Sequence, residues 1–311
     1  MTLQPRARFV ADALYGNTGC GKTHQCAIAA RRMWDKFGKR TRLVAGDTGG
    51  FDTMGSLVDE GIVIPFVVAN DPYPIETLDK VAQGYWPDDK GFLVSPGAPS
   101  AGGQDIGLYV FEGLTSFGDI MMRHLSHTKK RLSQDPAYTY VDGKTEFSGT
   151  NMSYYGEIQN RIYDFVVKSS MLPVERVIWT ALEGRGEEEG TKSPTYGPSI
   201  VGKKSTGKAG QWFGNMIHLE MLVTEVADPA TKQINHLQRR VMYIQPHADV
   251  IAKIPFPAKV RVPFDKAGEF SKAMGGQPYM DPPDLGKLYD LLESMKGAAA
   301  PKEAISATTA K

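Results

Sequence analysis

Eight residues near the start of the chain have the types and the spacing of a loop that holds phosphate groups. They match the pattern G-x-x-x-x-G-K-S/T. The glycines let the backbone bend so that successive N–H groups point at phosphate oxygens, and Lys22 reaches the terminal phosphates. The Thr23 hydroxyl is of the type that binds Mg²⁺. The pattern therefore predicts a nucleotide-binding loop with these members: Gly16, Asn17, Thr18, Gly19, Cys20, Gly21, Lys22 and Thr23.

The sequence on either side of this loop supplies the elements that such a loop needs. An apolar run at residues 9–15 precedes it, and a segment of helical character at residues 23–37 follows it and stops at Gly38. A simple glycine turn can match the pattern by chance, but the strand-like run before it and the helical segment after it supply the context that a phosphate-binding loop requires. We therefore expect a βα unit with the loop between its two elements.

A triphosphatase also needs a carboxylate at the end of a strand to hold Mg²⁺ through water. The apolar run at residues 106–112 ends in Glu112, which we predict to be this metal-associated acid; the alternative is a surface glutamate at a strand end. Thr180 lies in the expected strand at residues 176–182. It would hydrogen-bond the γ-phosphate or the attacking water, or it is an ordinary strand threonine. Thr23 and Glu112 are thus the predicted metal-site residues.

A second acid is expected to activate the attacking water. Asp47 follows the expected strand at residues 41–45, and a parallel sheet would bring it to the same rim as Glu112. Its alternative role is to form the turn before Gly49, and Asp52 competes for the catalytic role. The predicted catalytic set is Lys22, Glu112, Asp47 and Thr180.

Strands and helices alternate along most of the chain, which predicts an α/β fold with a mostly parallel central sheet. Besides those already named, we expect a strand at 62–68, helices at 53–60, 74–85, 115–131 and 154–171, and antiparallel C-terminal strands at 213–226 and 239–245. Two strands separate 9–15 from 106–112 along the chain. This order predicts an additional strand between those two in space, which would place an acid opposite the γ-phosphate.

Residues 1–250 form the predicted ATPase core, interrupted by two long polar segments at 132–152 and 183–211 that we expect to be flexible loops. A C-terminal extension follows at 251–295. The small polar residues at 296–311 predict a disordered tail.

The composition favours a cytoplasmic protein. The chain has 311 residues, of which 41% are hydrophobic, and a net charge of +1. Its two cysteines provide neither a disulfide framework nor a metal site, which is typical of a reducing compartment. The longest apolar run, residues 61–69, is interrupted by Pro65, so we expect no membrane span. Because the charge is balanced, a nucleic-acid partner must be argued from local patches.

Four stretches together resemble the RecA-like P-loop ATPases of bacteriophages, including single-strand annealing recombinases. They are LYGNTGCGKT at 14–23, GDTGG at 46–50, YVFEGLTS at 109–116 and WTA at 179–181. The stretches GPSIVGK at 197–203 and WFGN at 212–215 also fit the way those proteins re-enter their core. The resemblance covers about residues 9–245. It implies a RecA-like core that binds and hydrolyses ATP with Mg²⁺, assembles into a ring or filament, and acts on single-stranded DNA in the host cytoplasm.

The chain departs from the pattern of that family at two positions. Glu112 stands where the family commonly has aspartate, and Asp47 or Gly49 stands where relatives often have glutamate. The catalytic base therefore stays open between Asp47, Asp52 and Glu112. Nucleotide kinases and GTPases are disfavoured because the chain has neither a guanine-reading motif nor an arginine-rich lid.

Binding of single-stranded DNA needs cationic groups and aromatic side chains, and two segments meet these needs in part. The first contains Arg123, His124, His127, Lys129, Lys130, Arg131, Tyr138, Tyr140, Phe147, Tyr154 and Tyr155. The second contains Arg185, Lys192, Lys203, Lys204 and Lys208, offset by glutamates. The alternative is that both are solvated surfaces, the first with a loop packed by its own aromatic residues. Four of the cations, Arg185, Lys203, Lys204 and Lys208, are also candidates to complete a neighbouring subunit's site.

Three functions compete at this stage. The first is an ATP-hydrolysing, oligomeric protein that acts on single-stranded DNA in recombination or replication. The second is an ATPase for DNA packaging or assembly. The third is a nucleotide-gated scaffold without hydrolysis, which the departures at Glu112 and Asp47 favour.

Overall fold

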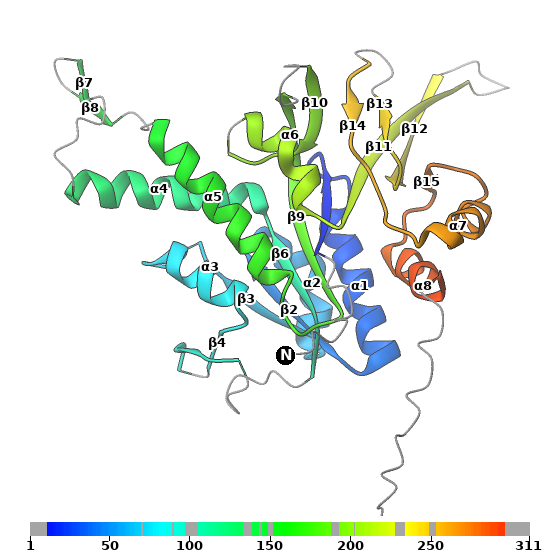
Figure 1. Ribbon diagram of the computed structural model, residues 1–311, viewed down its shortest axis with the longest axis horizontal. Coiled ribbons are helices and arrows are strands. Elements are labelled where there is room, and N and C mark those ends of the chain that lie inside the picture. The colour runs from blue at the N-terminus through cyan, green and yellow to red at the C-terminus, as the bar shows by residue number, and fades with distance from the viewer. Residues whose placement is uncertain are drawn as a thin grey trace, which may run out of the picture.

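The computed structural model describes residues 11–69, 71–88, 90–96, 105–132, 139–142, 145–148, 152–187, 193–201, 203–227, 234–248 and 253–295. Its centre is a twisted sheet with helices on both faces (Figure 1). The main strands are β1 (Ala11–Gly16), β2 (Arg40–Ala45), β3 (Val63–Val67), β6 (Ile106–Glu112), β9 (Arg176–Glu187), β11 (Asn215–Ala227), β12 (Ile234–Tyr243) and β15 (Tyr279–Met280).

The order of the strands confirms the predicted α/β fold with a mostly parallel central sheet and antiparallel C-terminal strands. Along the sheet they run β15-β12-β11-β1-β9-β6-β2-β3. The pairs from β11 to β3 are parallel, whereas β12 and β15 are antiparallel additions at the C-terminal edge. Strand β9 lies between β1 and β6, so the expected additional strand is confirmed. The carboxyl ends of β1, β9, β6 and β2 therefore meet along one rim of the sheet.

Each face of the sheet is covered by its own layer of helices. One layer contains α1 (Lys22–Phe37), α2 (Gly49–Asp59) and α8 (Leu285–Met295); the other contains α3 (Pro74–Ala82), α4 (Leu114–Leu132) and α5 (Met152–Ser169). Successive side chains of a strand point to opposite faces, so Val110 and Ile178 contribute to the first core while Phe111 and Trp179 contribute to the second. The Phe111 and Trp179 rings stack with centroids 4.2 Å apart.

The strand expected at 62–68, an apolar run that also predicts a buried strand, is β3 and is only partly buried. It lies at the edge of the sheet, and Pro65 is exposed on it. Proline has no N–H to donate to a further strand, so the edge is the place in a sheet where it fits. The helices at 74–82, 114–132 and 152–169 begin and end within three residues of the predicted bounds.

The segment 183–211 is ordered wherever the structure describes it, so the prediction of a flexible loop is wrong there. Strand β9 continues to Glu187, and β10 (Pro194–Pro198) pairs with it in antiparallel orientation. Helix α6 (Lys203–Trp212) follows and packs on both strands. The Tyr196 ring stacks on Phe256 with centroids 4.5 Å apart, so a contact distant in sequence holds this segment in place.

Smaller elements complete the description. The other segment expected to be a loop, 132–152, contains the hairpin β7 (Thr139–Asp142) and β8 (Thr145–Ser148); its remaining connections lie outside the described residues. The remaining short strands and helices are β4 (Trp86–Pro87), β5 (Leu93–Val94), β13 (His247–Ala248), β14 (Pro255–Phe256), η2 (Phe264–Lys266) and α7 (Ala267–Ala273). The tail predicted at 296–311 also lies outside the described residues. No helix among the described residues is long and apolar enough to span a membrane.

The C-terminal segment packs into the core through a buried polar network around Asp12 of β1. The Asp12 carboxylate, which is 1% exposed, accepts hydrogen bonds from Asn215 Nδ2 at 2.7 Å and from the Tyr289 hydroxyl of α8 at 2.7 Å. Arg176 of β9 lies 3.4 Å from the same carboxylate and 4.2 Å from the Tyr289 ring centroid. Burial, and then the charge of Asp12, raise the pKa of Tyr289, so its hydroxyl keeps the proton that it donates. This network ties three strands to α8.

Candidate functional site

The glycine-rich loop, residues 16–23, connects the carboxyl end of β1 to the N-terminus of α1, as expected. A Cβ at Gly16 would lie 2.1 Å from the Leu219 carbonyl oxygen of β11, so only glycine fits this position. Gly21 has φ +101°, a left-handed conformation that side chains disfavour, and it caps α1. The helix therefore starts at Lys22, and its first N–H groups have no partner within the helix. These groups and the positive end of the helix favour an anion at the loop.

Lys22 folds back over the loop. Its Nζ donates to the carbonyl oxygens of Gly16 at 2.8 Å and of Asn17 at 2.9 Å. Cys20 is buried beneath the loop, and burial raises the pKa of its thiol. Its side chain belongs to the core, so its predicted part in cofactor binding is limited to its backbone. The ammonium of Lys22 is held close to the place where the loop would meet phosphate.

Thr23 and Glu112 meet at the base of the loop. The Thr23 hydroxyl donates a short hydrogen bond to Oε1 of Glu112, the last residue of β6. The other oxygen, Oε2, is buried and has no hydrogen-bond partner among the described residues. Burial raises the pKa of Glu112. The hydrogen bond from Thr23 lowers this pKa, and the charge of Asp47 raises it. A hydroxyl beside an unpartnered carboxylate oxygen is a donor set that fits Mg²⁺, which prefers oxygen ligands.

Asp47 forms a turn and also faces the site. Its Oδ1 accepts the Gly49 N–H at 3.0 Å, which is the turn-forming role, and its Oδ2 accepts from the Ser116 hydroxyl at 3.2 Å. The side chain remains exposed at the rim. The competing Asp52 is exposed on α2 and does not line the same cleft. The structure therefore brings Asp47, and not Asp52, toward Glu112.

Thr180 lies on β9, between the loop strand β1 and the acid strand β6. It is 2% exposed, and its Oγ1 accepts the Gly113 N–H at 2.9 Å. This bond holds the backbone after Glu112 against β9. Thr180 is thus a satisfied strand threonine whose side chain also borders the site.

A cleft of about 590 Å³ joins these residues. It is lined by Thr18, Gly19, Gly21, Lys22, Thr23, His24, Asp47, Gly49, Thr53, Glu112, Gly113, Thr115, Ser116, Thr180, Ala181, Leu182 and Arg240. All four predicted catalytic residues and the predicted metal pair are in this set. The cleft lies at the carboxyl end of a parallel sheet, where α/β proteins bind ligands.

Arg240 is a cleft residue that the sequence did not indicate. It lies on β12, and its Cδ is 3.4 Å from the position that a Cβ on Gly21 would take. A single arginine in an antiparallel strand has no spacing that distinguishes it from its neighbour Arg239. Only the pairing of β11 with β12 carries it to the loop, where it adds positive charge beside Lys22.

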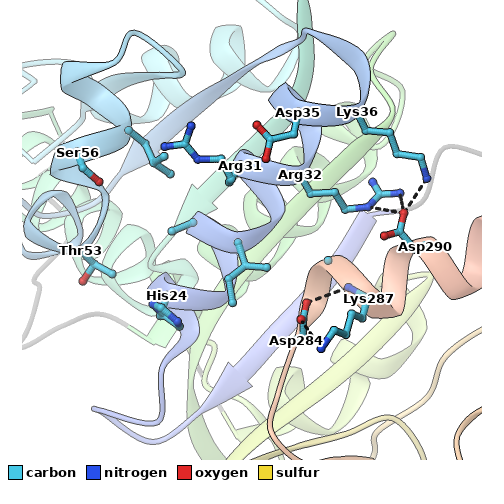
Figure 2. Close-up of a pocket in the computed structure, with 14 residues that line it drawn as sticks. His24, Arg31, Arg32, Asp35, Lys36, Thr53, Ser56, Asp284, Lys287 and Asp290 are labelled. Atoms are coloured by element: carbon cyan, nitrogen blue, oxygen red, sulfur yellow. Dashed lines mark hydrogen bonds and ion pairs between the residues drawn. The ribbon is translucent and has the colours of Figure 1, made fainter.

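A second hollow, of about 710 Å³, lies beside the cleft between α1, α2 and α8 (Figure 2). It shares His24 and Thr53 with the cleft. Its cations are paired with acids: Arg31 with Glu60, Lys287 with Asp284, and both Arg32 and Lys36 with Asp290 of α8 at 2.7 Å. Figure 2 marks the pairs of Asp290 with dashed lines. Because these charges neutralise one another, the hollow has little attraction for a phosphate group.

The residues predicted to contact DNA are only partly described. Arg123 on α4 and Arg185 on β9 are exposed. Tyr154 is 5% exposed and belongs to the core, so its predicted use as a stacking surface is wrong. Tyr138 and Lys192 lie outside the described residues, as do the side chains of His127, Lys129, Lys130, Arg131, Tyr140, Phe147, Lys203 and Lys204. Neither Arg185 nor Lys208 lines the cleft.

No protein-family model matches the chain, and no curated protein sequence matches it.

The chemistry of the cleft has three parts. Backbone amides and Lys22 would hold the oxygens of a polyphosphate, Thr23 and Glu112 would hold a divalent cation, and Asp47 would accept a proton from water at the rim.

Proposed function

We propose that the protein is a RecA-like P-loop ATPase of bacteriophage type that binds and hydrolyses ATP with Mg²⁺ in this cleft. The observation that carries the proposal is the contact of the Thr23 hydroxyl with Glu112, whose second carboxylate oxygen is buried without a partner among the described residues, next to Lys22. A buried carboxylate oxygen without a partner is costly unless a cation is bound there. A hydrated Mg²⁺ beside the phosphate-binding loop would supply that partner through one of its waters.

Each cleft residue has a role in this proposal. Lys22 would leave its two loop carbonyls to bind the β- and γ-phosphates, and Thr23 and Glu112 would hold Mg²⁺, Glu112 through water. Asp47, at the end of β2, orients and deprotonates the attacking water. Arg240 neutralises charge that develops on the γ-phosphate. The amides at the start of α1 bind the remaining phosphate oxygens.

The position of β9 supports the RecA-like assignment. It separates the loop strand β1 from the acid strand β6, and Asp47, which follows the next strand β2, lines the same cleft as Lys22. We further propose that the protein assembles into a ring or filament and acts on single-stranded DNA. The exposed Arg123 and Arg185 support a cationic surface for this role.

One observation favours a second function, a nucleotide-gated scaffold that binds ATP without turnover. Both oxygens of Asp47 already accept hydrogen bonds, from Gly49 and Ser116, so the carboxylate is engaged in the turn and in the contact with Ser116 before any water is bound. In this case ATP binding alone would order the loop and the subunit contacts.

The decisive experiment measures ATP binding and hydrolysis with Mg²⁺, with and without single-stranded DNA, at two salt concentrations. We expect hydrolysis that DNA stimulates more strongly at low salt, because cationic contacts to phosphates release counterions. Lys22→Ala should abolish hydrolysis and weaken binding without unfolding the protein, whereas Lys80→Ala, an exposed lysine on α3, should change neither.

Each outcome separates the candidates. Binding without hydrolysis supports the scaffold. Hydrolysis that single-stranded DNA does not stimulate removes the recombination role and favours a packaging or assembly ATPase. Hydrolysis by Lys22→Ala at the wild-type rate would overturn the proposal.

A further inference from the structure

Two histidines and a glutamate form a cluster outside the cleft. Nδ1 of His218 lies 3.1 Å from Nε2 of His247, and Oε2 of Glu220 lies 3.8 Å from the same Nε2. One ligand atom from each of the three residues lies within 4.8 Å of the other two. The His218 side chain is fully buried, that of His247 is 13% exposed and that of Glu220 is 36% exposed. The cluster is thus closed on one side and reachable from solvent on the other.

The fold builds this cluster from two segments. His218 and Glu220 are two residues apart on β11, so their side chains share one face of the strand. His247 begins β13 and comes from the chain that follows β12. The spacing His-x-Glu with a later histidine is short and common. Sequence alone therefore gives no reason to join the three residues.

Stacked rings fix the directions of both imidazoles. The His218 ring lies between Tyr15, at 4.7 Å, and Phe256, at 4.4 Å, measured between centroids. The His247 ring stacks on Tyr243 at 3.6 Å. The two ring nitrogens therefore face each other without freedom to rotate apart. This preorganisation lowers the cost of ordering ligands around an ion.

The distance between the two histidine nitrogens is close to that at a tetrahedral metal. Two histidine nitrogens bound at about 2.0–2.1 Å to one tetrahedral ion are separated by about 3.3 Å. The observed 3.1 Å between His218 and His247 is close to this value. The Glu220 carboxylate needs only a small movement to join them, and its partial exposure permits that movement.

A carboxylate also supports the first histidine from behind. Nε2 of His218 is 2.9 Å from Oε2 of Glu183, so the nitrogen that would not bind the metal has a carboxylate partner. Metal-binding histidines commonly have such a partner, which fixes the tautomer and increases the basicity of the ligand. The same Glu183 oxygen is 3.5 Å from Asn17 Nδ2 in the glycine-rich loop.

We propose that His218, Glu220 and His247 form a binding site for a divalent transition metal of the Zn²⁺ class, with Glu183 as a positioning residue. Two imidazoles and one carboxylate favour Zn²⁺ and its neighbours over Mg²⁺, which prefers oxygen ligands alone. Three protein ligands leave a fourth position for water. The site is distinct from the Thr23 and Glu112 pair and does not depend on ATP binding.

The test uses the full, untagged chain, stripped of metal and without nucleotide. Zn²⁺ is titrated in competition with a chromophoric chelator, and the bound metal is counted after gel filtration. We expect one equivalent per chain. Glu220→Gln and His247→Gln should each weaken binding at least tenfold, and Glu183→Gln should weaken it about 10–100-fold. The control His236→Gln changes an exposed histidine of β12 outside the cluster and should bind Zn²⁺ like the wild type.

Cobalt provides a second readout of the same site. Co²⁺ bound by the wild type should give the visible absorption of a tetrahedral ion, and Glu220→Gln should alter that spectrum even where His247→Gln fails to fold. Absence of stoichiometric Zn²⁺ in the wild type would overturn the proposal, as would equal affinity in Glu220→Gln and the wild type. The contact between His218 and His247 would then be only a hydrogen bond between imidazoles.

Discussion

The Thr23 hydroxyl donates a hydrogen bond to the Glu112 carboxylate across 89 positions of sequence. One residue lies in the first turn of α1, and the other ends β6. Strand β9 lies between β1 and β6, so the contact between Thr23 and Glu112 spans the carboxyl end of β9. This relationship places a loop hydroxyl and a strand-end acid at a single point, where Thr23 would contact one hydrated cation and Glu112 would hold it through water.

Replacing Glu112 by glutamine should stabilise the protein without nucleotide while it reduces hydrolysis. Burial raises the pKa of Glu112, which means that folding disfavours its charged form. The neutral amide removes that cost, so the melting temperature of the variant should rise. Loss of the carboxylate that would hold Mg²⁺ should lower the rate of ATP hydrolysis by at least about 10²-fold, because a bound metal ion supplies several kcal/mol of transition-state stabilisation. A lower melting temperature would contradict the assigned electrostatics.

The extra stability of Glu112→Gln relative to the wild type should depend on pH. The unfolded chain has the ordinary glutamate pKa of 4.5, and the folded chain has a higher one. Between the two values the folded state binds more protons, so the free energy of unfolding falls as pH rises through this window. Wild type and Glu112→Gln should therefore have similar melting temperatures below pH 4.5 and diverge toward neutral pH. Thermal unfolding across this range measures the difference.

Asp47→Asn should separate the base from the metal acid. If Asp47 deprotonates water, the variant should bind ATP with Mg²⁺ normally and lose turnover by about 10²–10⁴-fold. Glu112→Gln should in addition weaken the dependence on Mg²⁺. The matched control is Asp52→Asn, which changes an exposed acid of α2 outside the cleft and should leave both properties intact. Normal turnover in Asp47→Asn would remove it from the catalytic set.

Arg240→Ala should reduce hydrolysis by about 10²-fold, since it removes a positive group from the loop side of the cleft. Its neighbour provides the control. Arg239 forms an ion pair with Asp281 at 2.9 Å and does not line the cleft, so Arg239→Ala should hydrolyse ATP at the wild-type rate. Steady-state rates of the two variants at saturating ATP test the difference. Equal rates in Arg240→Ala and Arg239→Ala would mean that Arg240 does not neutralise the γ-phosphate. A cation elsewhere, for example in a neighbouring subunit, would then have that role.

Asp12→Ala should destabilise the fold by about 3–5 kcal/mol, because it leaves the buried Arg176 without its partner carboxylate. Tyr289→Phe removes one hydrogen bond to the same carboxylate and should cost about 1 kcal/mol. Glu60→Ala, which breaks an exposed pair with Arg31, should have little effect. Urea unfolding of the three variants gives the comparison, and a small effect of Asp12→Ala would contradict the importance of the network.

Local features of the sequence were sufficient for the glycine-rich loop, the elements beside it and the two acids at strand ends. The loop needs glycines at fixed positions, and the strand at 106–112 shows a continuous apolar run that ends at Glu112. The fold class followed from the alternation of strands and helices. These signals are local because backbone conformation and burial of one face depend on neighbouring residues.

Contacts between distant residues decided the rest. Arg240 reaches the loop only because β12 pairs with β11, and His218 meets His247 only because β13 folds back beside the sheet. The segment 183–211 looks like a loop by composition, yet pairing of β10 with β9 and the stacking of Tyr196 on Phe256 order the part of it that the structure describes. Packing and strand pairing between distant parts of the chain stabilise these contacts. The spacing of residues along the sequence therefore does not predict them.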